Sequence, residues 1–161
     1  MLFTRRGLER AGFQGWRPFS DIHSSRDCPT SGGVYVVVRT GTDQCTVMAT
    51  SCGGWFKQQD PTVSPDALAA NWVTNAECLY IGKANNLHRR LKQFASFGAG
   101  KPIGHWGGRL IWQLADHPRL LVAWKETPDR DPLAVEAELI RTFREAYGKP
   151  PFANEPHKLG R

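Results

Sequence analysis

The sequence lacks any long apolar run, because its longest apolar stretches, such as residues 34–38, are far too short to cross a bilayer. No apolar segment follows residues 1–6, as a secretory signal would require. The four cysteines are scattered, without the paired spacing of a zinc finger or a redox motif, and we expect reduced thiols. These absences favour a cytoplasmic protein that makes no contact with a membrane.

Internal repeats and low-complexity tracts are also missing. A length of 161 residues, of which 40% are hydrophobic, suffices for one buried core but not for two ordinary domains. We therefore expect a single domain over residues 1–161. The formal net charge of +6 suits a polyanionic partner such as nucleic acid, although many basic proteins bind none.

Three segments carry the pattern of buried strands. Residues 32–39 are β-branched and aromatic after a turn-like Pro-Thr-Ser, residues 77–83 close at Gly82, and residues 120–124 end at a polar stretch. Together they predict a small central sheet of three strands, mainly antiparallel.

Helical patterns lie between and after these strands. The apolar spacing predicts one helix over 86–97, capped by Asn85 or Asn86, and another from Pro132 to Tyr147, stopped by Gly148. A short helix is expected at 64–72, and a helical turn or two within 104–114. The order predicts an α/β (α+β) domain in which helices flank the sheet.

Two tripeptides, one in each of the first two expected strands, form the halves of a known signature: Gly33-Val34-Tyr35 and Tyr80-Ile81-Gly82. The second half continues as KANNLHRRL over 83–91, a turn and an arginine-bearing helix. Further along stand EAELI at 136–140 and a late asparagine at 154. From residue 32 to 154 the chain resembles the GIY-YIG nuclease family, both the N-terminal incision domain of bacterial excision-repair nucleases and stand-alone GIY-YIG proteins.

Helix geometry separates the two glutamates of the second long helix. At about 100° per residue, Leu133, Ile140 and Phe143 share one stripe with Glu136 in its middle, whereas Glu138 points nearly the opposite way. A carboxylate on a core-facing stripe needs a charged partner, either a metal ion or an arginine in a structural salt bridge. Geometry alone leaves both possibilities open. The family resemblance implies that Glu136 is the ligand of one Mg²⁺ or Mn²⁺ ion.

The same test applies to the tandem arginines of the first long helix. Arg90 flanks the apolar stripe of that helix, whereas Arg89 projects away from it. Without the motif, Arg90 would be a solvated helix arginine. The resemblance implies that it binds the non-bridging oxygens of a phosphate, for which its planar fork is suited.

The remaining site residues follow from the resemblance. Tyr35 and Tyr80 would line the site, and one of them would position or deprotonate the attacking water; without the motif, both would be core aromatics. Because a free tyrosine has a pKa of about 10, a base role requires a nearby cation such as Lys83. Asn154 would orient a metal-bound water or close the last helix against the sheet.

Several segments depart from the compact domain of the family. These are an N-terminal extension (1–31), an insertion between the first two motif strands (40–76) and a C-terminal tail (150–161). The loop 101–109 is rich in glycine, aromatic and basic residues; it suits a phosphate backbone and a stacked base, or else forms a tight connector with a buried tryptophan. His88 and His105 are further candidate proton carriers. The expected nucleic-acid contacts are Lys83, Arg89, Lys92, Lys101, His105 and Arg109.

The sequence therefore predicts a metal-dependent endonuclease that hydrolyses phosphodiester bonds, with DNA the expected substrate. Two other functions stay open: a non-cleaving nucleic-acid-binding module of the same fold, and a structural or partner-binding domain, supported only by the six tryptophans. Target choice would come from the insertion, the termini, a homodimer or a partner protein.

Overall fold

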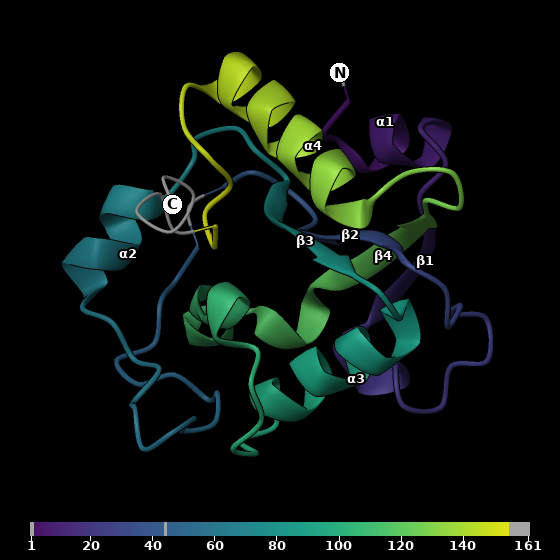
Figure 1. Cartoon of the computed structure of the whole chain (residues 1–161). Helices are drawn as coiled ribbons and strands as arrows, with labels where there is room; N and C mark the ends of the chain where they lie inside the picture. The colour runs from purple at the N-terminus through teal and green to yellow at the C-terminus, as the bar shows by residue number, and fades with distance from the viewer. Residues whose placement is uncertain (1, 44, 155–161) are drawn as a thin grey trace.

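The computed structural model describes residues 2–43 and 45–154, and these form one mixed α/β unit around a four-stranded sheet. Strand order is β1-β4-β2-β3, and every neighbouring pair is antiparallel. Figure 1 shows α4 over one face of the sheet, with α3 on the opposite face. The strands are β1 (Gln14–Pro18), β2 (Gly33–Val38), β3 (Cys78–Ala84) and β4 (Leu121–Glu126). The predicted fold class is thus confirmed.

The predicted strand count was wrong by one, because β1 lies in the N-terminal extension. This strand, at the edge of the sheet, is half-exposed and polar, and its register shifts between Gly15 and Arg17. Trp16 has a positive φ of 56°, and Pro18 ends the strand. Such a bulged edge strand has none of the apolar alternation by which strands are recognised in a sequence.

The N-terminal extension also contributes to the core. α1 (Arg5–Arg10) is capped by the Thr4 side chain and buries Leu8, and the single 3₁₀ turn η1 (Phe19–Asp21) buries Phe19. Phe3 packs edge-on against Phe143 of α4, with ring centroids 5.1 Å apart. Residues 2–31 are therefore an integral part of the domain.

Strand β2 is one of the two interior strands of the sheet, and all six of its residues are buried. Its even-numbered valines join the hydrophobic cluster with Phe143 and Ile140 of α4, whereas Tyr35 and Val37 join the cluster beneath α3. A strand that is buried on both faces reads as a continuous apolar run, which is why this segment was recognisable in the sequence.

The predicted long helices form close to their expected bounds. Asn86 caps α3 (Leu87–Gly98), and Asp131 caps α4 (Pro132–Tyr147), which ends at Gly148 with φ 81°. Leu133, expected on the buried stripe, is 53% exposed. The fully buried residues of α4 lie in its second half, so its first turn extends beyond the core.

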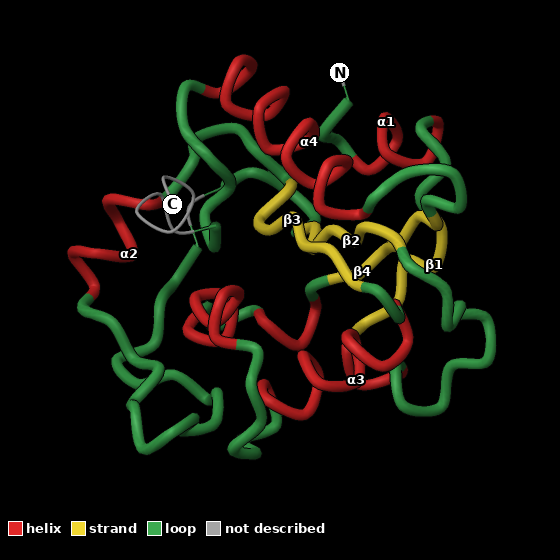
Figure 2. Tube along the Cα trace, viewed as in Figure 1, coloured by secondary structure: helices red, strands yellow, loops and turns green. Residues whose placement is uncertain are grey.

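The insertion packs against the domain partly through α2 (Pro65–Asn71), whose buried Leu68 joins the core cluster beneath α3. Gln113, at the end of the 3₁₀ segment η2 (Trp106–Gln113), is the main polar anchor. Its buried side chain accepts from the Val63 N–H and donates to the carbonyls of Val63 and Met48. A further 3₁₀ turn, η3 (His117–Arg119), follows. Figure 2 shows how much of the insertion is loop.

The four cysteines are free thiols, of which Cys28 and Cys78 are buried. Within residues 2–43 and 45–154, no helix combines the length and the apolar character needed to cross a membrane.

Candidate active site

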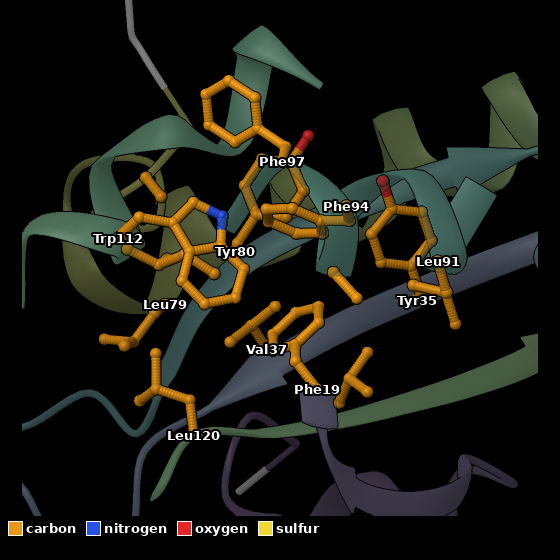
Figure 3. Close-up of a cluster of buried hydrophobic side chains, with 14 of the residues drawn as sticks. Phe19, Tyr35, Val37, Leu79, Tyr80, Leu91, Phe94, Phe97, Trp112 and Leu120 are labelled. Carbon is orange, nitrogen blue, oxygen red and sulfur yellow. The ribbon is translucent and has the colours of Figure 1, made fainter. Parts of the chain in front are cut away.

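The two motif tyrosines lie side by side beneath α3. Tyr35 on β2 and Tyr80 on β3 are both buried, with ring centroids 6.0 Å apart. Both rings pack against Phe94 of α3, and Figure 3 shows the three side chains within the larger aromatic cluster. The antiparallel register places Tyr35 opposite Gly82, the last residue of the second motif half.

The motif glycines provide the space that this arrangement needs. A Cβ atom at Gly82 would come within 2.6 Å of the Tyr35 phenol oxygen, and one at Gly33 would collide with the backbone of β4 at Lys125 and crowd Leu87. Real Cβ atoms essentially never make contacts below 3.0 Å. Gly82 therefore provides the place that the Tyr35 ring occupies.

We expect Gly82→Ala to destabilise the fold by about 1–3 kcal/mol, the usual cost of overpacking a close-packed core. Gly107→Ala is the matched control, since its Cβ would lie 3.4 Å from the Tyr80 hydroxyl and meet nothing closer. Urea denaturation measures both free energies of unfolding. Equal stability of the two variants would contradict the steric explanation.

His105 is the closest polar partner of Tyr35. Its Nε2 atom lies 2.6 Å from the Tyr35 hydroxyl, and its ring stacks on Phe94 at 3.7 Å with 4° between the planes. Burial and the charge of Arg90 hold the pKa of His105 well below its usual value, so the imidazole is neutral. Its Nδ1 atom is buried and has no hydrogen-bond partner among residues 2–43 and 45–154.

The burial of His105 corrects the expectation that this residue contacts nucleic acid from a surface loop. The side chain has no exposed surface, because the chain after Lys101 turns inward beneath α3. His105 and Tyr35 are in contact although they lie 70 residues apart in the sequence. Only its residue type pointed to the site beforehand, because histidine is the side chain suited to proton transfer at neutral pH.

Both tyrosines hold their protons at neutral pH. Burial raises the pKa of Tyr35 well above its ordinary value, and burial together with the charge of Glu136 raises the pKa of Tyr80 to about 12. Arg90 opposes both shifts but does not overcome burial. A tyrosine here can therefore accept a proton only as it gives up its own.

Arg90 turns toward the site, whereas Arg89 is exposed. The Nη1 atom of Arg90 donates to the Gly104 carbonyl at 2.8 Å and to the Gln93 side chain at 3.1 Å. Within the described part of the chain, Nε and Nη2 of Arg90 make no hydrogen bond. One edge of the guanidinium thus holds the loop before His105, and the other is available to an anion.

Glu136 is half-buried on α4, and no described side chain forms a hydrogen bond or ion pair with it. Burial raises the pKa of this carboxyl, and the charge of the exposed Lys83 lowers it only in part. Glu138, by contrast, is half-exposed and paired with Arg130 at 2.5 Å. The arginine salt bridge considered for Glu136 is therefore absent among the described residues.

The donor set around Glu136 limits which metal it could hold. No group of three or more His, Cys, Asp or Glu side chains gathers as a metal site within residues 2–43 and 45–154. A lone carboxylate without a protein partner fits Mg²⁺ or Mn²⁺, because such ions keep most of their waters and bind through one or two carboxylates and a substrate phosphate. It does not fit structural zinc, which needs four protein ligands.

Asn154 lies against β3, an edge strand of the sheet. Its Oδ1 atom accepts from the Ile81 N–H, and its Nδ2 atom donates to the Ile81 carbonyl, both at 2.9 Å. The neighbouring Ala153 N–H donates to the Leu79 carbonyl. The amide thus replaces a missing strand directly beside the second motif half.

We expect Asn154→Ala to lower the free energy of unfolding by about 2 kcal/mol or more, because two buried backbone groups of Ile81 lose their partners. Asn154→Asp retains the acceptor but not the donor, and we expect a smaller loss. Chemical denaturation measures both variants. Unchanged stability with impaired metal binding would instead assign Asn154 to the metal-bound waters.

A family model described as the GIY-YIG catalytic domain matches residues 72–149. Residues 72–149 therefore belong to the GIY-YIG family. No curated protein and no solved structure matches the chain significantly. The family match includes β3, α3, β4 and α4, and with them Tyr80, Arg90 and Glu136.

The first half of the GIY-YIG signature lies upstream of the matched segment, on the far side of the insertion. Strand pairing nevertheless places β2 directly between β3 and β4, the two strands of the matched segment. The sheet thereby restores the signature that the insertion interrupts in sequence.

The basic residues expected to contact nucleic acid differ in exposure. Lys83, Arg89 and Lys101 are exposed, and Lys92 is half-exposed. The Arg109 guanidinium lies over the Trp106 ring at 4.6 Å and donates to the Trp106 carbonyl. The loop containing Trp106 is thus a packed connector with a partly buried tryptophan, the second of the two forms considered for it.

Proposed function

We propose that this GIY-YIG domain is a metal-dependent endonuclease that hydrolyses phosphodiester bonds in DNA. The observation that carries the proposal is Glu136, a half-buried carboxylate without a described protein partner, whose charge acts on both motif tyrosines. A cation at Glu136 would relieve the cost of that burial.

Each requirement of phosphodiester hydrolysis has a candidate residue. Glu136 would hold one Mg²⁺ or Mn²⁺, which when bound would supply positive charge to the phosphate and to the leaving oxygen and would lower the pKa of a bound water. Arg90 binds the non-bridging oxygens through its available edge. Lys83, next to the last residue of β3, adds positive charge close to Glu136.

The Tyr35–His105 pair accepts the proton of the attacking water. In the resting site the Tyr35 hydroxyl donates a hydrogen bond to Nε2 of the neutral His105, and its oxygen can still accept a hydrogen bond from water. As the water attacks, its proton passes to the Tyr35 oxygen while the Tyr35 proton moves to His105. A phosphate bound at Arg90 offsets the charge that otherwise disfavours protonated His105. Tyr80, whose hydroxyl lies near Gly107, helps to position the water.

A non-cleaving nucleic-acid-binding module is the second candidate. It is favoured by Nη1 of Arg90, which is already engaged by the Gly104 carbonyl and Gln93. This candidate predicts binding that weakens steeply with salt and no metal-dependent cleavage.

Cleavage of supercoiled plasmid and of branched oligonucleotides, with Mg²⁺ or Mn²⁺ and with a chelator, separates the two candidates. We expect nicked or linear product only when metal is present, and the preferred oligonucleotide identifies the substrate class. Salt-sensitive binding without cleavage of any substrate would establish the non-cleaving module instead.

A further inference from the structure

We propose that the insertion carries a stacking platform for an unpaired base of the substrate strand, formed by Trp55 and flanked by Lys57 and Lys101. The inference rests on the proposed function and specifies its substrate as nucleic acid with unpaired nucleotides beside the scissile phosphate. Trp55 and Leu133 are the large hydrophobic residues that the described structure leaves most exposed, and Trp55 is 57% exposed.

The loop that carries Trp55 is fixed to the domain. The Gly54 N–H donates to the Phe97 carbonyl at 2.9 Å, and the Cys52 N–H donates to the Trp112 carbonyl at 3.1 Å. Gly53 and Gly54 are buried, with Gly54 pressed against the Lys101 carbonyl so closely that no side chain fits there. Figure 1 shows this part of the insertion beside the C-terminal end of α3. Trp55 is therefore exposed on an anchored segment.

A short chain of contacts joins this loop to the candidate active site. The Phe56 ring lies over Gly104, where a Cβ atom would come within 3.0 Å of it. The Gly104 carbonyl accepts the hydrogen bond from Arg90, and His105 follows directly in the chain. A strand whose phosphate binds Arg90 would thus pass the insertion loop within a few nucleotides.

The turn after Phe56 is strained in a way that favours a functional role. Lys57 and Gln58 both have positive φ values, 51° and 64°, and the Gln59 N–H donates back to the Phe56 carbonyl. Such two-residue turns ordinarily use glycine or asparagine, because the left-handed conformation costs other residues about 1–2 kcal/mol each. Strain of this kind collects at binding and catalytic sites. Here it holds the Lys57 ammonium 5.3 Å from the Phe56 ring centre, two residues along the chain from Trp55.

The chemistry of this surface fits a single strand of nucleic acid. Trp55 and Lys57 are exposed on one loop, and the exposed Lys101 packs its backbone against Gly54 of that loop. An indole and two lysines in this arrangement can stack a base and bind the adjoining phosphates. The nearest carboxylate in sequence, Asp60, is turned toward the Thr62 N–H. Bases within a duplex are already stacked on their neighbours, so the platform selects nucleotides that are unpaired.

Binding to labelled single strands of about 12 nucleotides tests the inference. The protein carries Glu136→Gln to prevent cleavage, and one strand is of thymidine while the other has the same backbone without bases. We expect Trp55→Ala to weaken binding of the thymidine strand about tenfold and to leave binding of the abasic strand unchanged. Trp55→Phe should retain most of the affinity, and Leu133→Ala, the other exposed hydrophobic residue, serves as control.

The outcomes separate this inference from the proposed function. Equal weakening of both strands by Trp55→Ala, or no weakening of either, would overturn the stacking platform while the nuclease proposal stands. Loss of a dimer in Trp55→Ala without a base-dependent effect would assign the tryptophan to a contact between copies, and would also overturn it. Absence of any oligonucleotide binding by the parent protein would refute the proposed function itself.

Discussion

Glu136→Gln is expected to lower metal-dependent cleavage by about 1,000-fold or more, the largest effect of any substitution in the site. The amide keeps the size of the side chain but removes the charge that would hold the cation, and charge stabilisation of this kind supplies several kcal/mol to a transition state. Initial rates of plasmid cleavage over a range of Mg²⁺ and Mn²⁺ concentrations measure the loss.

Glu138→Gln is the matched control, since it makes the same chemical change on the same helix at a half-exposed residue paired with Arg130. We expect that variant to cleave at the rate of the unaltered protein. Comparable losses in both variants would mean that α4 as a whole, and not Glu136, determines the rate.

Thermal unfolding provides a second readout for Glu136 that does not depend on cleavage. At ten times its dissociation constant, a bound cation adds about 1.4 kcal/mol of stability, or roughly 3–5 °C in Tm for a chain of this size. We expect Mg²⁺ or Mn²⁺ to raise the Tm of the unaltered protein and of Glu138→Gln but not that of Glu136→Gln.

Without metal, Glu136→Gln should unfold at a higher temperature than the unaltered protein at neutral pH. Burial raises the folded-state pKa of Glu136, so ionisation of this carboxyl costs stability once the pH exceeds its pKa in the unfolded chain. The cost disappears as the pH falls below that value, and the difference in Tm between the two proteins should disappear with it.

Arg90→Ala is expected to reduce cleavage about 100- to 1,000-fold, because the phosphate loses its charge-assisted hydrogen bonds in the transition state. Arg90→Lys should recover only part of the rate, since an ammonium keeps the charge but not the planar fork. Both variants lose hydrogen bonds to Gly104 and Gln93, so unfolding must be measured alongside cleavage.

Arg89→Ala is the comparison that separates binding from catalysis. The Arg89 side chain is exposed on the other side of α3, where it can bind phosphate only from the surface. We expect Arg89→Ala to weaken binding of nucleic acid and to reduce the slope of affinity against salt concentration by about one phosphate contact. The kcat for cleavage should stay unchanged. A fall in kcat for Arg89→Ala equal to that for Arg90→Ala would contradict the assignment of the two arginines.

The parts of this protein that local sequence patterns specify were predictable. β2 is a continuous apolar run, and α3 and α4 begin at residues whose side chains cap them. The helical period also separated Arg90 from Arg89 and Glu136 from Glu138, because orientation on a helix depends on spacing alone. The family match agrees with the motif resemblance over residues 72–149.

The parts that depend on distant contacts were not predictable. β1 exists because β4 offers it a partner, and its own residues carry no strand pattern. His105 reaches Tyr35 only because its loop folds inward, and Asn154 bonds to Ile81 across 73 residues of sequence. Neither hydrophobic periodicity nor helix-capping residues in the sequence indicate such pairings.

Both edges of the sheet are obstructed, so another polypeptide cannot easily add a strand to it. Unpaired strand edges are where proteins aggregate or exchange strands, and natural sheets obstruct them with bulges, prolines or covering chain. Asn154 occupies the backbone groups of Ile81 along β3, while the bulge at Trp16 and the ring of Pro18 disrupt β1 at the opposite side. Any association with a second copy or a partner protein would therefore use side chains, and we expect concentrated solutions of this protein to resist amyloid-like assembly.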